Sequence, residues 1–520
     1  MIRTLTLLSL LAVVLCGCKP TERTALRKKH TQQPAAGAQP ELVVPEPAAN
    51  TLPVVPDTPE PDPAASLLLV NATLQEYDPM RPWEKENPRQ SRAHGVYMGE
   101  GRVLTIGRVV RDATYVELIL PDVSRTVPAR VLRYDEDTNL ALLTVAHETD
   151  AGIFESRSPL ALGEPLKRGD AASYAGLING VEPVHVDLQA ENVAGERVPL
   201  MVMRASRPLP DGQTAGSPVV KDGKLSALGL SYKKQEQLLH SVNAELILRF
   251  LVQDKAGVPV MGVQLSPLDD PVFRRYLKLN ADSNGLYISK VLPGSAAEAA
   301  GLQVGDVLTA VDGLPVDNLG RCDHPRYGLH HVAVLLRGMK DCGQEMPLTI
   351  SRGGEVQQIS VKMNRDAVDN ALFRPQAPGV QPRYLMWGGM LFQPLTSTYL
   401  DELRTRSNGL LPLEFQMLEN DQDALRKAGC IEPVGLTFVL PTVATQGYED
   451  LRFSRLMAVN GKPVNRFADL PALLDEQTDN GLIRLEFNKP PYTVYVDRSA
   501  ADEVNSHLQQ TAIPKLRVVD

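Results

Sequence analysis

The 520-residue sequence has few cysteines, few aromatic residues and no excess of basic residues. Five cysteines are too few for a scaffold built on disulfides. Aromatic residues make up 5%, which does not suggest a stacking platform for single-stranded nucleic acid. Lys and Arg number 54 against 62 Asp and Glu, and the net charge of −8 argues against a general nucleic-acid binder. At roughly 100–200 residues per domain, the length predicts about three or four domains.

The N-terminus carries one short apolar run. Arg3 precedes residues 5–15, which are too short to span a bilayer as a stable helix and are typical of a secretion signal. Residues 15–18 read Leu-Cys-Gly-Cys and resemble a bacterial lipobox, whose lipidated residue is Cys18; the alternative is an ordinary signal peptide. We therefore expect residues 1–18 to be a lipoprotein signal peptide and Cys18 to anchor the chain in a membrane. Lys19 favours the outer membrane of a bacterial envelope, with the chain facing the periplasm.

Residues 19–65 hold about ten prolines among Ala, Gln, Thr and Glu, without apolar periodicity. Such a segment cannot bury enough apolar surface to offset the entropy lost on ordering, so it is predicted to be a disordered linker. After residue 65, short β-branched runs alternate with turn residues, which is typical of an all-β barrel or sandwich. Strands are expected at residues 66–73, 93–98, 102–106, 115–120, 129–132 and 140–145.

Three segments after residue 65 carry a recognisable pattern. They read VLTIGRVV at residues 103–110, DEDTNLALLTV at 135–145 and DGQTAGSPVVKDGKLSALGL at 211–230. These segments resemble the HtrA/Deg family of PDZ-bearing serine proteases, in particular its plant-type Deg branch. The resemblance covers nearly everything after residue 65. It implies a mainly β chain, with a chymotrypsin-like double β-barrel over residues 66–255 followed by two PDZ domains.

In each of these segments the catalytic residue of the family is replaced. Arg108 stands at the histidine position, Asn139 at the aspartate position and Ala215 at the serine position. Alanine has no nucleophilic atom, arginine stays protonated and cannot act as a base, and asparagine cannot stabilise an imidazolium. The domain is therefore predicted to be a pseudoprotease with no catalytic residue. Ser217, which replaces a glycine of the nucleophile loop, could rebuild a site only with a histidine such as His147 or His240.

Residues 256–366 are predicted to form PDZ 1. The run NGLYISKVLPGSAAEAAGLQVGDVLTAVDGLPV at residues 284–316 is close to a PDZ signature, with strands at 286–291 and 307–311. PDZ domains bind extended peptides, usually C-terminal tails, as an added strand beside a helix. The helix is expected around residues 329–337, and core packing is the alternative role for each candidate peptide-binding residue. These candidates are Met261, Gly262, Val263, Leu265, Leu329, Val332 and Leu336.

Cys322 and Cys342 lie within PDZ 1, with His324, His330 and His331 between them. Export to an oxidising compartment makes a Cys322–Cys342 disulfide reasonable. Free thiols and a metal site are the alternatives, although the spacing matches no standard zinc pattern. We predict no metal and no cofactor.

Residues 367–380 are predicted to be a linker, and residues 381–520 resemble the divergent second PDZ domain of plant-type Deg proteases. In that branch, the second PDZ domain is tied to subunit assembly and to internal occupancy of its own groove. The resemblance also implies a homotrimer, or a hetero-assembly with an active protease. The sequence therefore favours a scaffold, adaptor or holdase for peptide tails and unfolded proteins. The alternatives are an active serine endopeptidase of protein quality control with a non-standard site, and a purely structural envelope protein.

Overall fold

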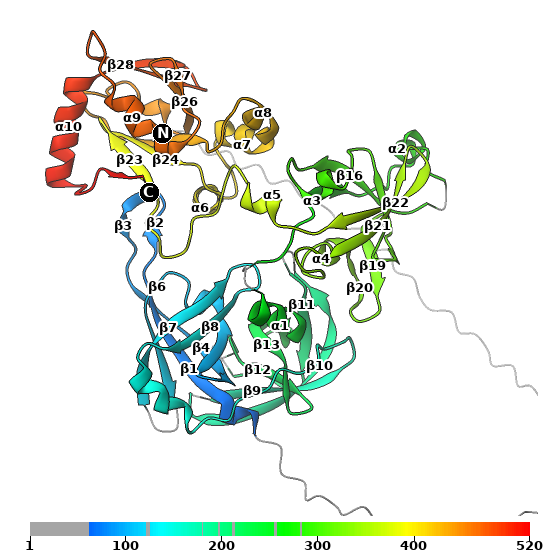
Figure 1. Cartoon of the computed structure of the whole chain (residues 1–520). Helices are drawn as coiled ribbons and strands as arrows, with labels where there is room; N and C mark the ends of the chain where they lie inside the picture. Colours follow the sequence, from blue (N-terminus) through cyan, green and yellow to red (C-terminus); the bar gives the residue numbers. More distant parts are fainter. Residues whose placement is uncertain are drawn as a thin grey trace, which may run out of the picture. The chain divides into compact units, whose positions relative to one another are not determined.

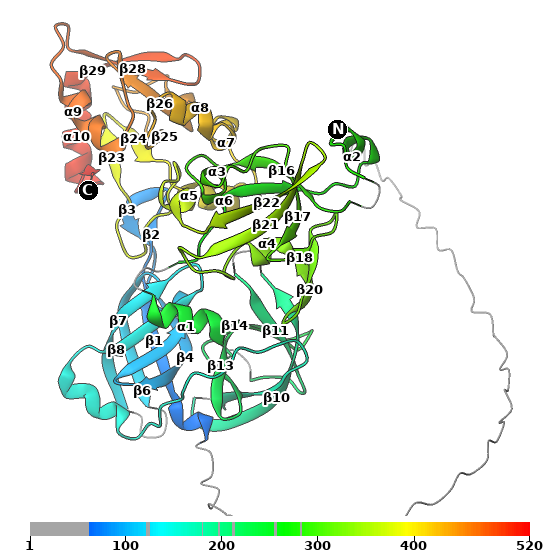
Figure 2. The same cartoon turned by 45° about the vertical axis from the view of Figure 1, so that its right-hand side comes forward.

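The computed structural model describes residues 62–120, 125–178, 180–195, 198–210, 214–253, 257–280 and 283–519. The predicted signal peptide, its Cys18 and most of the predicted linker lie outside the described residues. Two closed β-barrels are followed by two further sheets with their helices (Figures 1 and 2). Among the described residues, no helix is both long enough and apolar enough to cross a membrane.

The first barrel closes in the order β1-β4-β5-β8-β7-β6. Its interior is apolar because alternate residues of each strand point inward. In β1, for example, the buried residues Leu68, Val70, Ala72 and Leu74 alternate with half-buried ones. All six expected strands are present, two of them with the expected bounds. The strands are β1 (Leu67–Leu74), β4 (Arg89–Gly99), β5 (Arg102–Ile106), β6 (Ala113–Leu120), β7 (Arg125–Asp135) and β8 (Leu140–Val145).

Three short elements surround this barrel. A 3-10 turn, η1 (Pro63–Ser66), leads into β1 and is capped by Asp62, so the last residues of the predicted linker are ordered. A hairpin of β2 (Tyr77–Asp78) and β3 (Arg81–Lys85) extends from the barrel. Further 3-10 turns are η2 (Gly107–Val109) and η3 (Glu148–Phe154).

The second barrel closes in the order β10-β11-β14-β13-β12-β9. Its last strand leads into α1 (Ala244–Val252), and the Asn243 side chain accepts a hydrogen bond from the first helical N–H. The two barrels confirm the predicted chymotrypsin-like double β-barrel. The strands are β9 (Ala171–Ile178), β10 (Glu182–Ala194), β11 (Leu200–Ala205), β12 (Pro218–Lys221), β13 (Lys224–Lys233) and β14 (Leu238–Asn243).

PDZ 1 is a sheet in the order β15-β16-β17-β21-β22, with β18 paired to β17. β15 and β22 are therefore its two edge strands. A separate hairpin, β19–β20, precedes the one-turn helix α4. The elements are β15 (Val263–Ser266), α2 (Pro271–Tyr276), β16 (Leu286–Val291), α3 (Ala296–Ala299), β17 (Val307–Val311), β18 (Leu314–Pro315), β19 (Arg321–His324), β20 (Gly328–His331), α4 (Val332–Leu335), β21 (Glu345–Arg352), β22 (Glu355–Lys362) and α5 (Asp366–Asp369).

PDZ 2 is a sheet in the order β29-β28-β26-β25-β24-β23-β30, with β27 paired to β26. The C-terminal strand β30 pairs with β23, so the chain's own end covers that edge of the sheet. The elements are β23 (Tyr384–Trp387), β24 (Met390–Pro394), α6 (Ser397–Arg406), α7 (Leu413–Asn420), α8 (Gln422–Lys427), β25 (Val434–Val439), η4 (Glu449–Leu451), β26 (Ser454–Val459), β27 (Lys462–Pro463), η5 (Phe467–Asp469), α9 (Leu470–Asp475), β28 (Leu482–Phe487), β29 (Thr493–Asp497), α10 (Arg498–Thr511) and β30 (Arg517–Val518).

Residues 367–380, predicted to be a linker, are packed against the rest of the chain. Leu372 and Phe373 are buried and share a core cluster with α6, α7 and α8. The Gly379 N–H donates to Asp112 Oδ1 of the first barrel at 2.5 Å. The prediction failed here because it did not include the three helices that cover this apolar pair.

Candidate functional site

The positions of the family's histidine and aspartate are joined by backbone contacts. Arg108 lies in η2, directly after β5, and Asn139 directly precedes β8. Asn139 Oδ1 accepts a hydrogen bond from the Arg108 N–H at 2.7 Å, and its carbonyl accepts one from the Gly107 N–H at 2.7 Å. Asn139 has a φ of 54°, a left-handed conformation that asparagine tolerates better than most residues. Asn139 thus holds the turn that carries Arg108.

The Arg108 side chain reaches from the first barrel to the second. Its Nη2 donates to the carbonyl oxygen of Leu230, in β13, at 2.9 Å. Partial burial lowers the pKa of Arg108 from its ordinary value of 12.5. The guanidinium nevertheless stays protonated near neutral pH, because the ordinary pKa of arginine lies far above 7. Arg108 therefore serves as a cation and a hydrogen-bond donor.

The third position, Ala215, lies on a loop with close backbone contacts to the first barrel. The Ala215 carbonyl accepts a hydrogen bond from the His94 N–H of β4 at 2.8 Å. Gly216 follows with a φ of 77°, and its N–H donates to the Gly229 carbonyl at 2.8 Å. A Cβ on Gly216 would lie 2.1 Å from the His94 carbonyl oxygen, so only glycine fits there. The loop is thus tightly built around a side chain with no nucleophilic atom.

Ser217 takes part in a buried polar cluster that the sequence did not reveal. Its Oγ lies 2.8 Å from His94 Nδ1 and 3.2 Å from the Tyr174 hydroxyl. The exposed fractions of Ser217, His94 and Tyr174 are 0%, 1% and 0%, and burial raises the pKa of Tyr174 to about 12. The imidazole beside Ser217 therefore belongs to His94, whose place on β4 had no distinguishing sequence pattern. Because its Oγ is fully buried, Ser217 cannot meet a peptide bond in this conformation.

Neither histidine considered as a partner for Ser217 fills that role in the structure. His147 is exposed and precedes η3, and His240 lies within β14 opposite Val202 of β11. His240 thus lies on a strand, four residues before the helix α1 begins at Ala244.

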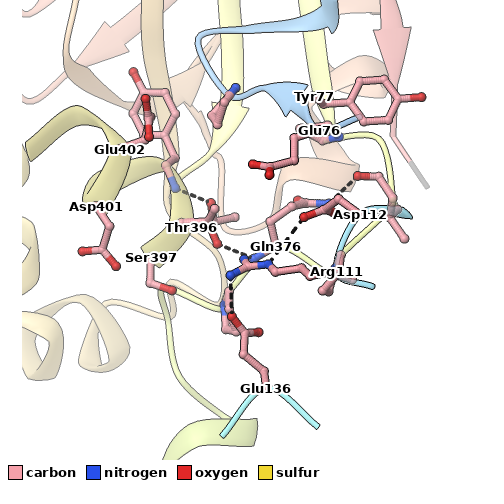
Figure 3. Close-up of a pocket in the computed structure, with 18 of the residues that line it drawn as sticks. Glu76, Tyr77, Arg111, Asp112, Glu136, Gln376, Thr396, Ser397, Asp401 and Glu402 are labelled. Carbon is pink, nitrogen blue, oxygen red and sulfur yellow. Dashed lines mark hydrogen bonds and ion pairs between the residues drawn. The ribbon is translucent and has the colours of Figure 1, made fainter. Parts of the chain in front are cut away.

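Two cavities meet at Arg108. A cavity of about 440 Å³ is lined by Arg108, Asn139 and Leu230 together with neighbours from the first barrel and from residues 195–200. A larger cavity of about 980 Å³ is bounded by the first barrel, residues 365–383 and α6. Figure 3 shows the charged side chains of this larger cavity, with Arg111 between Asp112 at 3.4 Å and Glu136 at 3.1 Å. The space beside Arg108 is thus roomy and contains paired charges.

The structure places four of the candidate peptide-binding residues of PDZ 1 at or just before its edge strand β15. Met261 and Gly262 are buried just before β15, and the half-buried Val263 and Leu265 lie on this edge strand. The Met261 carbonyl accepts from the Ala297 N–H at 2.9 Å, which fixes the loop against α3. No described strand pairs with the outer edge of β15. That edge is where an added peptide strand would pair.

The helical wall of this groove differs from the prediction. Residues 329–337 do not form one helix, because residues 321–331 form the β19–β20 hairpin and α4 is only one turn long. Leu329 lies on β20 with 57% of its surface exposed, whereas Val332 and Leu336 are buried in the PDZ 1 core. Val332 and Leu336 therefore pack in the PDZ 1 core, whereas the side chain of Leu329 lies outside that core.

The cysteines of PDZ 1 are free thiols in the structure, so the Cys322–Cys342 disulfide is not formed. Cys322 is buried in the PDZ 1 core, 3.9 Å from His330 Nε2, whereas Cys342 is exposed. Burial raises the pKa of Cys322 to about 11, which keeps this thiol protonated and unreactive near neutral pH. Within the described parts of the chain, no three His, Cys, Asp or Glu side chains are grouped to hold a metal ion.

A double β-barrel followed by two PDZ-like sheets is a chymotrypsin-like fold with two PDZ domains. Comparison with known families agrees, because PDZ domain profiles match residues 252–323 and 374–520. Protease Do-like 2, chloroplastic, of Arabidopsis thaliana is 25% identical over 473 residues, which cover 87% of this chain and 75% of that protein. The chain is thus similar, at low identity, to plant Do-like proteases.

More distant similarities extend to bacterial proteins. The periplasmic serine endoprotease DegP of Escherichia coli K12 is 21% identical over 240 residues, which cover 42% of this chain and 47% of that protein. A solved structure of the HtrA-type protease AlgW with a decapeptide aligns with a TM-score of 0.41 at 16% identity, covering 58% of this chain and 95% of the other.

Proposed function

We propose that this chain is a catalytically inactive HtrA/Deg homologue that binds the C-terminal tails or unfolded segments of other proteins. It acts as a scaffold, adaptor or holdase, and the lipidated Cys18 anchors it in the bacterial envelope, at the outer membrane facing the periplasm. The observation that carries the proposal is Ala215, which lies on a closely packed loop and whose carbonyl accepts a hydrogen bond from the His94 N–H of β4. The oligomeric form is a homotrimer or a hetero-assembly with an active protease.

Hydrogen bonding at two of the three positions supports loss of catalysis. The Asn139 side chain accepts the Arg108 N–H in the turn after β5, and the Arg108 side chain donates to the Leu230 carbonyl. The rival function, a serine endopeptidase with a relocated site, would have to use Ser217 and His94 because they are 2.8 Å apart. Their complete burial argues against this function, since a nucleophile must touch the carbonyl carbon that it attacks.

The two PDZ domains differ in what their sheet edges offer to a peptide. In PDZ 2, the chain's own strand β30 pairs with β23, and the Met386 N–H donates to the Leu516 carbonyl at 2.7 Å. In PDZ 1, the edge strand β15 carries half-buried apolar side chains, which pack against the core cluster that also contains Val332 and Leu335 of α4. Peptide capture by strand addition is therefore assigned to PDZ 1.

Peptide binding should depend on β15 and not on the opposite edge of the same sheet. We expect Leu265→Asp to weaken binding of a free C-terminal peptide by about tenfold or more, because it places a charge on β15, where an apolar side chain would contact the added peptide strand. Val356→Asp on the edge strand β22, where Val356 is 73% exposed, is the matched control and should leave the affinity unchanged.

The measurement is fluorescence anisotropy of peptides selected by the full-length chain from an array of C-terminal sequences. Amidation of the peptide's C-terminus should also weaken binding. Failure of the wild type to select any peptide, or equal losses in Leu265→Asp and Val356→Asp, would reject PDZ 1 as the binding site.

A further inference from the structure

The one-turn helix α4 lies at the boundary between PDZ 1 and the second barrel. Val332, Leu335 and Leu336 of this segment are buried in the PDZ 1 core. Val334 instead belongs to the core cluster of the second barrel, as does Tyr327 from the turn before β20. A helix of four residues has almost no stability of its own. The position of α4 must therefore be set by its contacts on both sides.

The helix α1 contacts the chain just before α4. Glu245 Oε2 accepts hydrogen bonds from Arg326 Nη1 at 2.8 Å and from the Tyr327 hydroxyl at 2.7 Å. The Arg326 carbonyl in turn accepts from the Arg168 N–H of the second barrel at 2.8 Å. These contacts fix the tip of the β19–β20 hairpin to the second barrel.

The same helix contacts the chain just after α4. Arg249, whose side chain is 8% exposed, donates from Nη1 to the Gly338 carbonyl at 2.6 Å and forms an ion pair with Asp341. Gln253 Nε2 also donates to Asp341 Oδ1, at 2.7 Å. Glu245 and Arg249 are four residues apart and so lie on one face of α1. One face of α1 therefore contacts the segment that contains α4 on both sides, at residues 326–327 and at residues 338–341.

A further contact connects α4 to the strand that would receive a peptide. Arg337, two residues after α4, forms an isolated antiparallel bridge with Val260, three residues before β15. β15 and α4 are the two walls of the proposed groove, so the distance between them depends on this segment.

We infer that α1 of the second barrel, through Glu245 and Arg249, holds α4 in place and thereby sets the width of the PDZ 1 peptide groove. This inference rests on the proposed peptide binding by PDZ 1 and assigns Glu245 and Arg249 as positioning residues for it. The double barrel then acts as a rigid support for peptide binding, which is a role that needs no catalytic residue.

The test is a double variant of the full-length chain, Glu245→Gln with Arg249→Met, which removes the charge from both contacts. Gln keeps the length of Glu, and Met keeps the unbranched apolar stem of Arg but not its guanidinium. The matched control is Arg204→Met, which removes the exposed ion pair with Glu191 on the same barrel. Hydrogen exchange measured by mass spectrometry reports on α4, and fluorescence anisotropy reports on the affinity for a peptide selected by the wild type.

We expect exchange at residues 326–341 to rise about tenfold in the double variant and peptide affinity to fall about tenfold, whereas β21 and β22 keep their protection. Arg204→Met should change neither measurement. Unchanged exchange at α4, or faster exchange with unchanged peptide affinity, would overturn the inference. If the wild type binds no peptide, the proposed function fails, and the exchange at α4 still decides whether α1 fixes this helix. Glu245→Gln alone, expected to act in the same direction, covers the case in which the double variant does not fold.

Discussion

Replacing Arg352 with alanine is expected to lower the free energy of unfolding of PDZ 1 by about 3 kcal/mol. The Asp306 carboxylate is 1% exposed and receives two hydrogen bonds from Arg352, from Nε and from Nη2, each at 2.7 Å. Without the guanidinium, the donor that this buried carboxylate keeps within the described part of the chain is the Gln303 N–H, at 2.8 Å. A buried charge that loses its partner costs far more than the loss of a surface ion pair.

The matched control for Arg352→Ala is Arg321→Ala in the same domain. Arg321 pairs with Asp317 at 2.7 Å, but the two side chains are 52% and 32% exposed, and we expect a loss of about 1 kcal/mol or less. Hydrogen exchange at β17 and β21 of the full-length chain gives both free energies. Equal losses in the two variants would show that burial of Asp306 does not matter.

Replacing Gly216 with alanine should destabilise the second barrel by about 3 kcal/mol or more. The left-handed backbone already disfavours a side chain, and the new Cβ would lie 2.1 Å from the His94 carbonyl oxygen. Backbone atoms on both sides leave no flexible group to move, so β4 or the nucleophile loop would have to shift. Hydrogen exchange at β12 and β13 measures the loss.

Gly169→Ala separates the clash from the backbone strain. Gly169 has a φ of 86°, and an added Cβ there meets nothing within 4 Å. This variant should cost about 1–2 kcal/mol, which is the price of left-handed backbone alone. If Gly216→Ala lowered the free energy of unfolding no more than Gly169→Ala does, the loop would not be packed closely against the His94 carbonyl.

The strands could be predicted where the local pattern and the tertiary structure agree. Residues 102–106, 140–145, 286–291 and 307–311 alternate or run apolar between turn residues, and each forms the expected strand. The assignment of Arg108, Asn139 and Ala215 to the triad positions rests on the family pattern around them and stays a prediction.

The errors lie where distant contacts decide the local structure. The expected helix at residues 329–337 gave way to a hairpin, because Tyr327 and its neighbours pack on the second barrel and α1. Leu372 and Phe373, within the predicted linker at residues 367–380, are buried by helices that had not been predicted. The His94–Ser217 contact joins residues 123 positions apart, and neither residue type nor spacing indicates it.

The central claim is that the double barrel does not cleave peptide bonds, and proteolysis of fluorescein-labelled casein tests it most directly. The purified full-length chain would be compared with Ser217→Ala and with the triple variant Arg108→His, Asn139→Asp, Ala215→Ser. We expect the wild type and Ser217→Ala to release no fluorescence above buffer, and any cleavage to appear only in the triple variant. Cleavage by the wild type that a serine-directed inhibitor blocks and that Ser217→Ala abolishes would contradict the claim.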